Sequence, residues 1–579
     1  MTNLFDFTDE EALGAVISVD TATVIVRIDD LEKLKRLQVN RLVVLQSSKA
    51  GNFLIGIVQK ITRKPDATQN DGELDEILPN ENNLVRISLI GTMINKSGSD
   101  RNIFRRTLEV VPDIDAFCFA LEGERLTKFM QVISAVKVDG PTLELGHFTL
   151  DDSATAYLNG NKLFQRHAFI TGSTGSGKSW TTAKLVEQIA KLPQANAVLF
   201  DIHGEYNTLE SDEFRHLKIA GPSEMHSGIG LNDGVMHLPY WLLGYEALVS
   251  MLVDRTDQNA PNQSMVMTRI VLEAKRRYLE EQGATELLEN LTIDSPVPFS
   301  LEGVQNSLNA TNVEMVTGSN GREKQGPFNG KLSRLISRLE AKTLDRRLGF
   351  LFSPPIECMN IDWLEELVCT LLAETGAQRD GKGGVKIIDF SEVPADILPL
   401  IVSLMADIVF SASLWTTAET RHPIALLCDE AHLYIPHTEK ANASASVAVE
   451  LFERIAKEGR KYGIGLVIIS QRPSELNRTV LSQCSNVIAM RLSNADDQNV
   501  VKRLLPDSLG GFAEILPVLD VGEAVVVGDA SLLPSRIRVS EPKYRPNSQT
   551  VPFWDRWNQD DPVSDIATAV QAWRRQSSN

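Results

Sequence analysis

The chain has 579 residues, of which 43% are hydrophobic and 23% charged, and its formal net charge is −18 at pH 7. The length predicts two to four domains, and the composition is typical of a soluble globular protein. The acidic balance argues against a protein coated in nucleic acid, although a nucleic-acid channel needs positive charge only along its own walls.

Three features bear on compartment and membranes. The N-terminus is acidic and lacks the basic and then apolar pattern of a signal peptide. The most apolar long stretch, residues 397–415, contains Pro399 and Asp407, and a charge at mid-membrane is costly. The five cysteines form no CxxC pair. We therefore expect a buried core helix at 397–415, no membrane, no zinc site or disulfide framework, and a reducing, cytoplasmic compartment.

Residues 1–140 are rich in short runs of β-branched residues, and the polar stretch 63–83 interrupts them as a long exposed loop. Runs at this spacing indicate a small barrel or sandwich, and we predict an N-terminal β-barrel. The strands are expected at 16–20, 23–28, 41–45, 53–58 and 84–90.

From about residue 165 apolar strands alternate with helices, which predicts an α/β fold with a parallel sheet covered on both faces. The strands are expected at 166–171, 197–200, 424–428, 464–469 and 486–490. This core is expected to comprise residues 141–214 and 381–540. Between its parts, helical patterns at 245–253, 265–282 and 331–345 predict an inserted helical subdomain over 215–380. Residues 541–579 form a C-terminal extension that ends in an amphipathic helix at 564–575.

Residues 172–179, Gly-Ser-Thr-Gly-Ser-Gly-Lys-Ser, match the P-loop pattern GxxxxGK[ST] between a buried strand and a helix. Glycines let backbone N–H groups turn toward phosphates, and the helix N-terminus adds its positive dipole end. We expect Lys178 to reach the β- and γ-phosphates of ATP and Ser179 to ligate Mg²⁺. The predicted nucleotide-binding residues here are Gly172, Ser173, Thr174, Gly175, Ser176, Gly177, Lys178, Ser179 and Trp180.

A second acidic motif follows the apolar strand at 424–428. Asp429 at the strand end can hold Mg²⁺ through its water shell, and Glu430 can accept a proton from the attacking water. With a P-loop in the same chain, this pair predicts a RecA-like, ATP-hydrolysing core.

Two further strand ends carry candidate residues. Gln471 closes the strand at 464–469 and can orient the attacking water or sense the γ-phosphate. The segment 201–206 closes the second strand, and its Glu205 can add a carboxylate near the γ-phosphate. His203 in the same segment is either functional or a satisfied loop histidine.

Basic residues stand just before two strands. In RecA-like rings the neighbouring subunit supplies a cation to the γ-phosphate, and Arg460 suits that role because its guanidinium is planar and always charged. Arg454 is the alternative candidate, and Arg166 is expected to contact nucleotide across the same interface. A solvated basic turn is the other interpretation of this segment.

A possible nucleic-acid contact lies in the helical subdomain. Lys331, Arg334, Arg338 and Lys342 share one helix face and form either a phosphate-binding stripe or a solvated face. The glycine-rich loop 318–331, with Arg322 and Lys324, is a second candidate.

These motifs together resemble the HerA family of the HerA–FtsK superfamily over nearly the whole chain. The resemblance includes the barrel and the segments at 162–167, 201–206, 428–432, 458–463, 470–474 and 519–524, with Pro534 beyond. The chain departs mildly at Gln165, where the approach to the P-loop often has glycine. The DEAH string at 429–432 also suggests a superfamily 2 helicase, but no QxxGRxGR-type motif follows it.

The resemblance implies a homohexameric ring that translocates double-stranded DNA by hydrolysing ATP with Mg²⁺. It also implies a partner docked on the N-terminal barrel, either a NurA-like nuclease in DNA end resection or an effector in phage defence, such as a sirtuin-type NAD hydrolase. The competing hypothesis is an ATPase ring that serves as a scaffold and gates a partner effector with little movement on DNA.

Overall fold

The structure is a computed structural model of the whole chain. It describes residues 5–49, 51–65, 81–94, 103–108, 110–134, 141–225, 228–317, 321–372, 383–505, 513–548, 551–558 and 565–576. These residues form two compact units. Unit 1 comprises residues 1–163, 486–491 and 505–540, and unit 2 comprises 164–485, 492–504 and 541–579.

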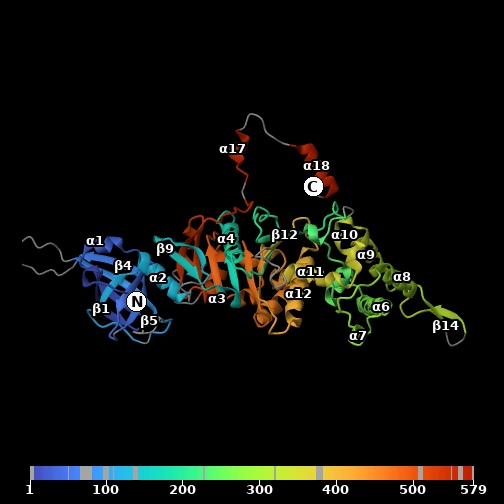
Figure 1. Cartoon of the computed structure of the whole chain (residues 1–579), viewed down its shortest axis with the longest axis horizontal. Coiled ribbons are helices and arrows are strands. Elements are labelled where there is room, and N and C mark those ends of the chain that lie inside the picture. Colours follow the sequence, from blue (N-terminus) through green and yellow to red (C-terminus); the bar gives the residue numbers. More distant parts are fainter. Residues whose placement is uncertain are drawn as a thin grey trace, which may run out of the picture. The chain divides into compact units, whose positions relative to one another are not determined.

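A closed six-stranded barrel begins unit 1 and confirms the predicted β-barrel (Figure 1). The strand order is β2-β1-β7-β3-β4-β5, the pairing of β2 with β5 closes it, and β6 extends β5 at one side. The expected loop at 63–83 is shorter than predicted, because β4 and β5 continue to pair as far as Pro65 and Glu81. The rest of that loop lies outside the described residues. The strands are β1 (Gly14–Asp20), β2 (Thr23–Arg27), β3 (Leu42–Gln46), β4 (Asn52–Pro65), β5 (Glu81–Ile94), β6 (Ile103–Arg105) and β7 (Phe117–Ala120), with helix α1 (Leu31–Arg36) between β2 and β3.

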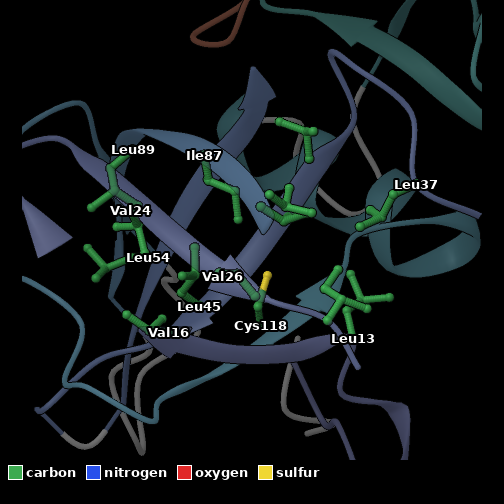
Figure 2. Close-up of a cluster of buried hydrophobic side chains, with 14 residues drawn as sticks. Leu13, Val16, Val24, Val26, Leu37, Leu45, Leu54, Ile87, Leu89 and Cys118 are labelled. Atoms are coloured by element: carbon green, nitrogen blue, oxygen red, sulfur yellow. The ribbon is translucent and has the colours of Figure 1, made fainter. Parts of the chain in front are cut away.

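The barrel interior is filled by aliphatic side chains that alternate along the strands (Figure 2). Val24, Val26, Leu45 and Leu54 are fully buried there. This alternation is the period-two pattern that a strand produces when one face meets a core, and it is the reason why the β-branched runs predicted these strands.

The remainder of unit 1 is an antiparallel strand run, β19-β20-β21-β8-β9, with helix α2 (Gly123–Ile133) packed on β9. Strand β19 was expected among the parallel strands of the core, but it pairs antiparallel with β20. The strands are β8 (Leu143–Phe148), β9 (Asp151–Leu158), β19 (Asn486–Met490), β20 (Glu523–Val527) and β21 (Ser535–Val539). The two compact units divide the chain differently from the four predicted domains. The domain boundaries at residues 140, 214, 380 and 540 therefore stay predictions.

Unit 2 is built on a parallel sheet with the order β13-β12-β16-β11-β17-β18-β10. Every neighbouring pair in this run is parallel, which confirms the predicted α/β fold. The strands are β10 (Ala168–Thr171), β11 (Ala197–Asp201), β12 (Phe214–Ile219), β13 (Val235–Met236), β16 (Val385–Asp389), β17 (Ile424–Cys428) and β18 (Ile464–Ser470). The sequence analysis missed β12, β13 and β16. The assignment of 215–219 to the helical insertion was wrong, because β12 alternates polar and apolar residues and lacks the continuous apolar run of the central strands.

Helices cover this sheet, and α4 (Lys178–Ala190) begins with Lys178 and Ser179 of the P-loop. The other helices include α12 (Leu398–Trp415), α13 (Ala443–Glu458), α14 (Arg478–Gln483) and α15 (Ala495–Leu504), and α3 (Gly160–Gln165) precedes β10. Among the described residues, α12 alone is long and apolar enough to cross a membrane, and 72% of it is buried inside the protein. It packs against α13, which confirms the predicted core helix.

The insertion is helical as predicted, and its helices pack on one another (Figure 1). They are α5 (Tyr245–Leu252), α6 (Ala260–Glu281), α7 (Thr285–Leu288), α8 (Leu301–Asn312), α9 (Ser333–Leu344), α10 (Gly349–Phe352) and α11 (Trp363–Leu372). A short hairpin, β14 (Met315–Thr317) and β15 (Glu323–Gln325), stands where a loop was expected. After residue 540 come a segment without regular secondary structure and two exposed helices, α17 (Phe553–Trp557) and α18 (Ile566–Arg575).

A cavity made in the barrel core should destabilise the barrel. Leu54 is fully buried in β4, so Leu54→Ala should lower barrel stability by about 2–5 kcal/mol and speed amide hydrogen exchange in β3, β4 and β5. All seven tryptophans lie outside residues 1–163, so the unfolding transition followed by tryptophan fluorescence should change far less. The control is Leu31→Ala, at a side chain that is 40% exposed. Unchanged exchange in Leu54→Ala would contradict the described packing.

Candidate nucleotide site

Three strand ends bring the main candidate residues together. Strands β17, β18 and β10 are neighbours in that order, and all three are parallel. Their carboxyl ends therefore lie at one edge of the sheet, which is the edge where open α/β sheets bind ligands. Asp429 follows β17, Gln471 follows β18 and the P-loop follows β10.

The P-loop has the backbone that its glycines permit. Gly175 has φ 72° and Gly177 has φ 106°, both in the left-handed region that disfavours side chains. The loop tightens through a hydrogen bond from Ser176 N to Ser173 O at 3.0 Å, and α4 starts at Lys178. Among the described residues, the buried hydroxyl of Ser176 has no hydrogen-bond partner. A polar group buried this way calls for a ligand or water, and the loop offers its donors at a helix N-terminus.

Lys178 is buried and held by both carboxylates of the acidic motif. Its Nζ lies 3.1 Å from Asp429 Oδ1 and 2.9 Å from Glu430 Oε1. Burial by itself would lower the pKa of Lys178, but the two carboxylates raise it above its usual range. The lysine is therefore a fixed cation at the P-loop.

Glu430 is buried and has a strained backbone. It adopts φ 44°, which is uncommon for a residue other than glycine, and such strain is often found at functional positions. Its Oε1 accepts a hydrogen bond from Gln471 Nε2, and His432 Nδ1 lies 3.2 Å from its Oε2. Burial would raise the pKa of Glu430, but His432, Lys178 and Gln471 together hold it well below its usual range. The carboxylate is ionised and can accept a proton.

Gln471 connects the acidic motif to the P-loop. Its Oε1 accepts a hydrogen bond of 2.6 Å from Thr174 Oγ1, while its amide nitrogen donates to Glu430. A side chain that contacts both the phosphate loop and the candidate base is placed to respond to the γ-phosphate.

The end of β11 adds a second layer around Asp429. Tyr206 donates its hydroxyl to Asp429 Oδ2 at 3.2 Å. Asp201 orders this loop by accepting from the backbone N–H groups of Glu205 and Tyr206. Burial raises the pKa of Asp201 to about 7, and the nearby carboxylates of Asp429 and Asp389 contribute to that increase. The site thus concentrates negative charge that a cation would stabilise.

Glu205 contacts the predicted magnesium ligand itself. Ser179 donates its hydroxyl to Glu205 Oε2 at 2.7 Å. This places Glu205 beside the first turn of α4, while His203 is exposed. Trp180, the next residue of α4, is 37% exposed, and the Arg545 guanidinium lies over its ring.

The predicted arginines lie at the opposite edge of the sheet. Arg166 precedes β10 and Arg460 precedes β18, so both stand at the amino ends of strands whose carboxyl ends form the site. The seven residues of β18 span about 23 Å. Next to Arg166, His167 accepts a hydrogen bond at Nδ1 from Leu466 N and donates one from Nε2 to Ala456 O, at 3.0 Å each. Neither arginine is placed at the P-loop of its own chain.

The alternative arginine and the basic stripe have acidic partners. Arg454 lies 3.7 Å from Glu458 and stacks on Phe410. Lys331 lies just before α9, whereas Arg334, Arg338 and Lys342 lie on the helix and face carboxylates. These pairs are Arg334 with Asp257 at 3.5 Å, Arg338 with Asp254 at 2.9 Å, and Lys342 with Asp396 at 3.5 Å. The second candidate loop, 318–331, is described from residue 321 on and carries Lys324 on β15.

Sequence reasoning did not single out His432, Tyr206 and Asp201 as members of the site. Asp201 and Tyr206 lie in the segment 201–206, and His432 lies in the segment 428–432. Both segments directly follow a predicted strand, and that position was the one sequence feature that could have identified these residues. Tyr206 acts through a contact with Asp429 on a different strand end, whereas His432 contacts Glu430 two residues away and Asp201 orders its own loop.

Two family models match the chain, "Helicase HerA, central domain" over residues 143–409 and "Helicase HerA-like C-terminal" over residues 373–558. The DNA double-strand break repair helicase HerA of Saccharolobus solfataricus is 26% identical over 495 residues, covering 84% of each chain. The probable DNA double-strand break repair helicase HerA of Methanocaldococcus jannaschii is 24% identical, over 71% of this chain and 78% of that one.

Among solved structures, the plasmid coupling protein TrwB in complex with ADP and Mg²⁺ is similar with a TM-score of 0.43 and 15% identity, covering 74% of this chain and 95% of that one. The two HerA models follow one another along the chain and contain the P-loop, the acidic motif and Gln471. The chain belongs to the HerA-type ATPases and is an ATP-hydrolysing P-loop enzyme.

Proposed function

We propose that this chain is an ATP-driven translocase of double-stranded DNA. It acts as a homohexamer with a partner nuclease or other effector, in DNA end processing or anti-phage defence. The observation that carries the proposal is the arrangement of Lys178, Glu430 and Gln471 at one sheet edge, within two HerA models. The names of the relatives, which describe helicases of DNA double-strand break repair, support DNA as the substrate.

The site suits ATP with Mg²⁺. Ser179 and Asp429 would hold the cation, which neutralises charge on the phosphate oxygens when bound. The donor set fits a hard cation, because it offers a hydroxyl and a carboxylate, with Glu205 hydrogen-bonded to that hydroxyl. The residues 172–179 would cradle the phosphates through their backbone N–H groups.

Lys178 has two sets of partners in this account. In the structure it pairs with Asp429 and Glu430, and with ATP bound it would contact the β- and γ-phosphates. Moving the ammonium from Glu430 to the phosphates removes a positive charge from beside the carboxylate. Glu430 then becomes a better proton acceptor for the attacking water, since an adjacent cation favours the ionised form.

Gln471 orients the attacking water in the proposed mechanism. Its amide already contacts Glu430 and Thr174, so a γ-phosphate at the P-loop would lie within its reach. Hydrolysis and release of phosphate would alter these contacts, and the strand ends would pass that change to the rest of unit 2.

A ring is proposed because the arginines predicted to act on the phosphates precede the strands whose carboxyl ends form the site. Arg460 and Arg166 stand at the amino edge of the same sheet, about one strand length away from the P-loop. A neighbouring subunit that presents its amino edge would supply them, with Arg460 as the finger.

The barrel within residues 1–140 is proposed as the docking surface for the effector, whether a nuclease or a sirtuin-type enzyme. The described barrel residues enclose a hydrophobic core and contain no nucleotide-binding motif. A closed barrel leaves no free edge in its own sheet and offers its outer surface for recognition.

The alternative is an ATPase ring that gates its effector with little movement on DNA. The observation that favours it is the stripe on α9, where three of four basic side chains already face carboxylates. Such pairs compete with phosphate contacts, and the net charge of −18 adds long-range repulsion.

DNA-stimulated ATPase across a salt series separates the two functions. The translocase should be stimulated by double-stranded DNA without any partner, and the stimulation should fall steeply as salt rises, because phosphate contacts release counterions. Single-stranded DNA of equal length is the control. An ATPase that is indifferent to DNA but changes when a partner binds would favour the scaffold.

Lys178→Ala should abolish nucleotide binding or hydrolysis and leave the fold intact, because the mutation removes the only cation described at the P-loop. Nucleotide binding by calorimetry and phosphate release measure the loss. Lys191→Ala, at the exposed end of the same helix, is the control. Normal turnover in a folded Lys178→Ala chain would refute the site.

Glu430→Gln should retain ATP binding and slow hydrolysis by about 10²-fold or more, because the general base is lost. Bound nucleotide extracted after incubation should be mostly ATP. Accumulation of ADP at the wild-type rate would show that another group takes the proton.

Arg460→Ala should bind nucleotide nearly normally and lose about 10³-fold in hydrolysis, as expected for a finger acting in trans. The control is Lys461→Ala, which removes the adjacent exposed cation. Mixing the Arg460→Ala and Lys178→Ala chains should restore partial activity, because some interfaces then combine an intact P-loop with an intact arginine.

The mixed rings must be verified by mass measurement. Absence of recovery in verified mixed rings would argue against a trans role for Arg460. Arg454→Ala and Arg166→Ala in the same mixing assay would then identify the arginine that acts.

A further inference from the structure

The start of the C-terminal extension is attached to the helix that follows the P-loop. Residues 541–547, called here the C-terminal strap, belong to unit 2 and have no regular secondary structure. Tyr544 N donates to Glu187 Oε1 of α4 at 2.8 Å. Pro542 and Pro546 are buried, and their fixed φ restricts the path of the strap between these points. The strap is thus a built part of the fold at this position.

The strap also contacts the loop that carries Glu205. Thr208 Oγ1 donates to Arg545 O at 2.7 Å, and Asn547 N donates to Glu205 O at 2.6 Å. Because Glu205 accepts from Ser179, the strap is one residue away from the predicted magnesium ligand. It therefore lies along the α4 side of the nucleotide site.

Arg545 lies over the exposed ring of Trp180. Its guanidinium carbon is 5.6 Å from the ring centroid, and its Nε donates to Glu541 Oε1 at 2.6 Å. The carboxylate thus holds the guanidinium from within the strap. Trp180 directly follows Ser179, the last residue of the P-loop, and its indole is 37% exposed.

The position of Trp180 matches the place of a nucleotide base. Phosphates held by residues 172–179 would leave the ribose and base to extend along the outside of the first turn of α4. Trp180 is an exposed side chain of that turn, and a planar cation above an aromatic ring is a general platform for stacking a flat, electron-rich heterocycle. A base between two planar groups needs about 7 Å, twice a contact of ~3.5 Å, so a small outward shift of the flexible Arg545 side chain would admit it.

We propose that the adenine base of ATP binds between the Trp180 ring and the Arg545 guanidinium, so that the C-terminal strap is part of the nucleotide pocket. This inference rests on the proposed function, because it requires the phosphates to occupy the P-loop. The proposal assigns recognition of the base in part to the C-terminal strap, whose Tyr544 contacts Glu187 of α4 from more than 350 residues away along the chain.

The test compares a nucleotide with its base-free counterpart in the full-length protein. Affinities for Mg·ATP and for inorganic tripolyphosphate with Mg²⁺ are measured by calorimetry on Trp180→Ala and Arg545→Ala. Each variant should bind ATP about tenfold more weakly, because one stacking partner is lost, and tripolyphosphate should bind as it does to the wild-type protein. Trp180→Phe, which keeps an aromatic face, should retain most of the ATP affinity.

Lys543→Ala is the matched control, because it removes an exposed cation from the same strap that lies over Tyr544 and not over Trp180. Unchanged ATP affinity in both Trp180→Ala and Arg545→Ala would overturn the proposal. Equal weakening for ATP and tripolyphosphate would also overturn it, since that result means that the strap only supports the P-loop. Failure of the site itself is distinguishable, because wild-type protein would then bind neither probe.

Discussion

The buried contact of Lys178 with Asp429 and Glu430 is the interaction on which the rest of the site depends. The lysine comes from the P-loop after β10, and the carboxylates come from the end of β17, two strands away in the sheet. Breaking one partner of a buried ion pair leaves an uncompensated charge, so the three groups constrain one another strongly. The parallel order β17-β18-β10 is what brings them within 3.1 Å, and it also places Gln471 between them.

The two edges of the sheet divide the chemistry of the proposed enzyme. The carboxyl edge carries the phosphate loop, the candidate base and the carboxylates, whereas the amino edge carries Arg166 and Arg460. His167 fixes the amino edge, because its two ring nitrogens link β18 and α13, and burial lowers its pKa so that it stays neutral there. This division is the basis of the proposed ring, in which two copies would together complete each catalytic unit.

Much of this arrangement could be predicted from the sequence, because the signals are local. The P-loop needs glycines at positive φ just before a helix, and the apolar runs before Asp429 and Gln471 indicate strands that end in polar residues. Strand β12 escaped prediction because polar residues interrupt its buried apolar ones, and the role of Tyr206 depends on a contact with Asp429, 223 residues away along the chain. The partners on α9 were equally hidden, since a helix pattern shows which residues share a face but not which acids on other elements face it.

A structure of the protein with Mg²⁺ and a non-hydrolysable ATP analogue tests the central claim most directly. The account predicts that Lys178 Nζ leaves Glu430 Oε1, 2.9 Å away in the structure, and contacts the β- and γ-phosphates, while Ser179 exchanges Glu205 for the cation. An analogue bound elsewhere, or bound at residues 172–179 with Lys178 still paired to both carboxylates, would contradict it.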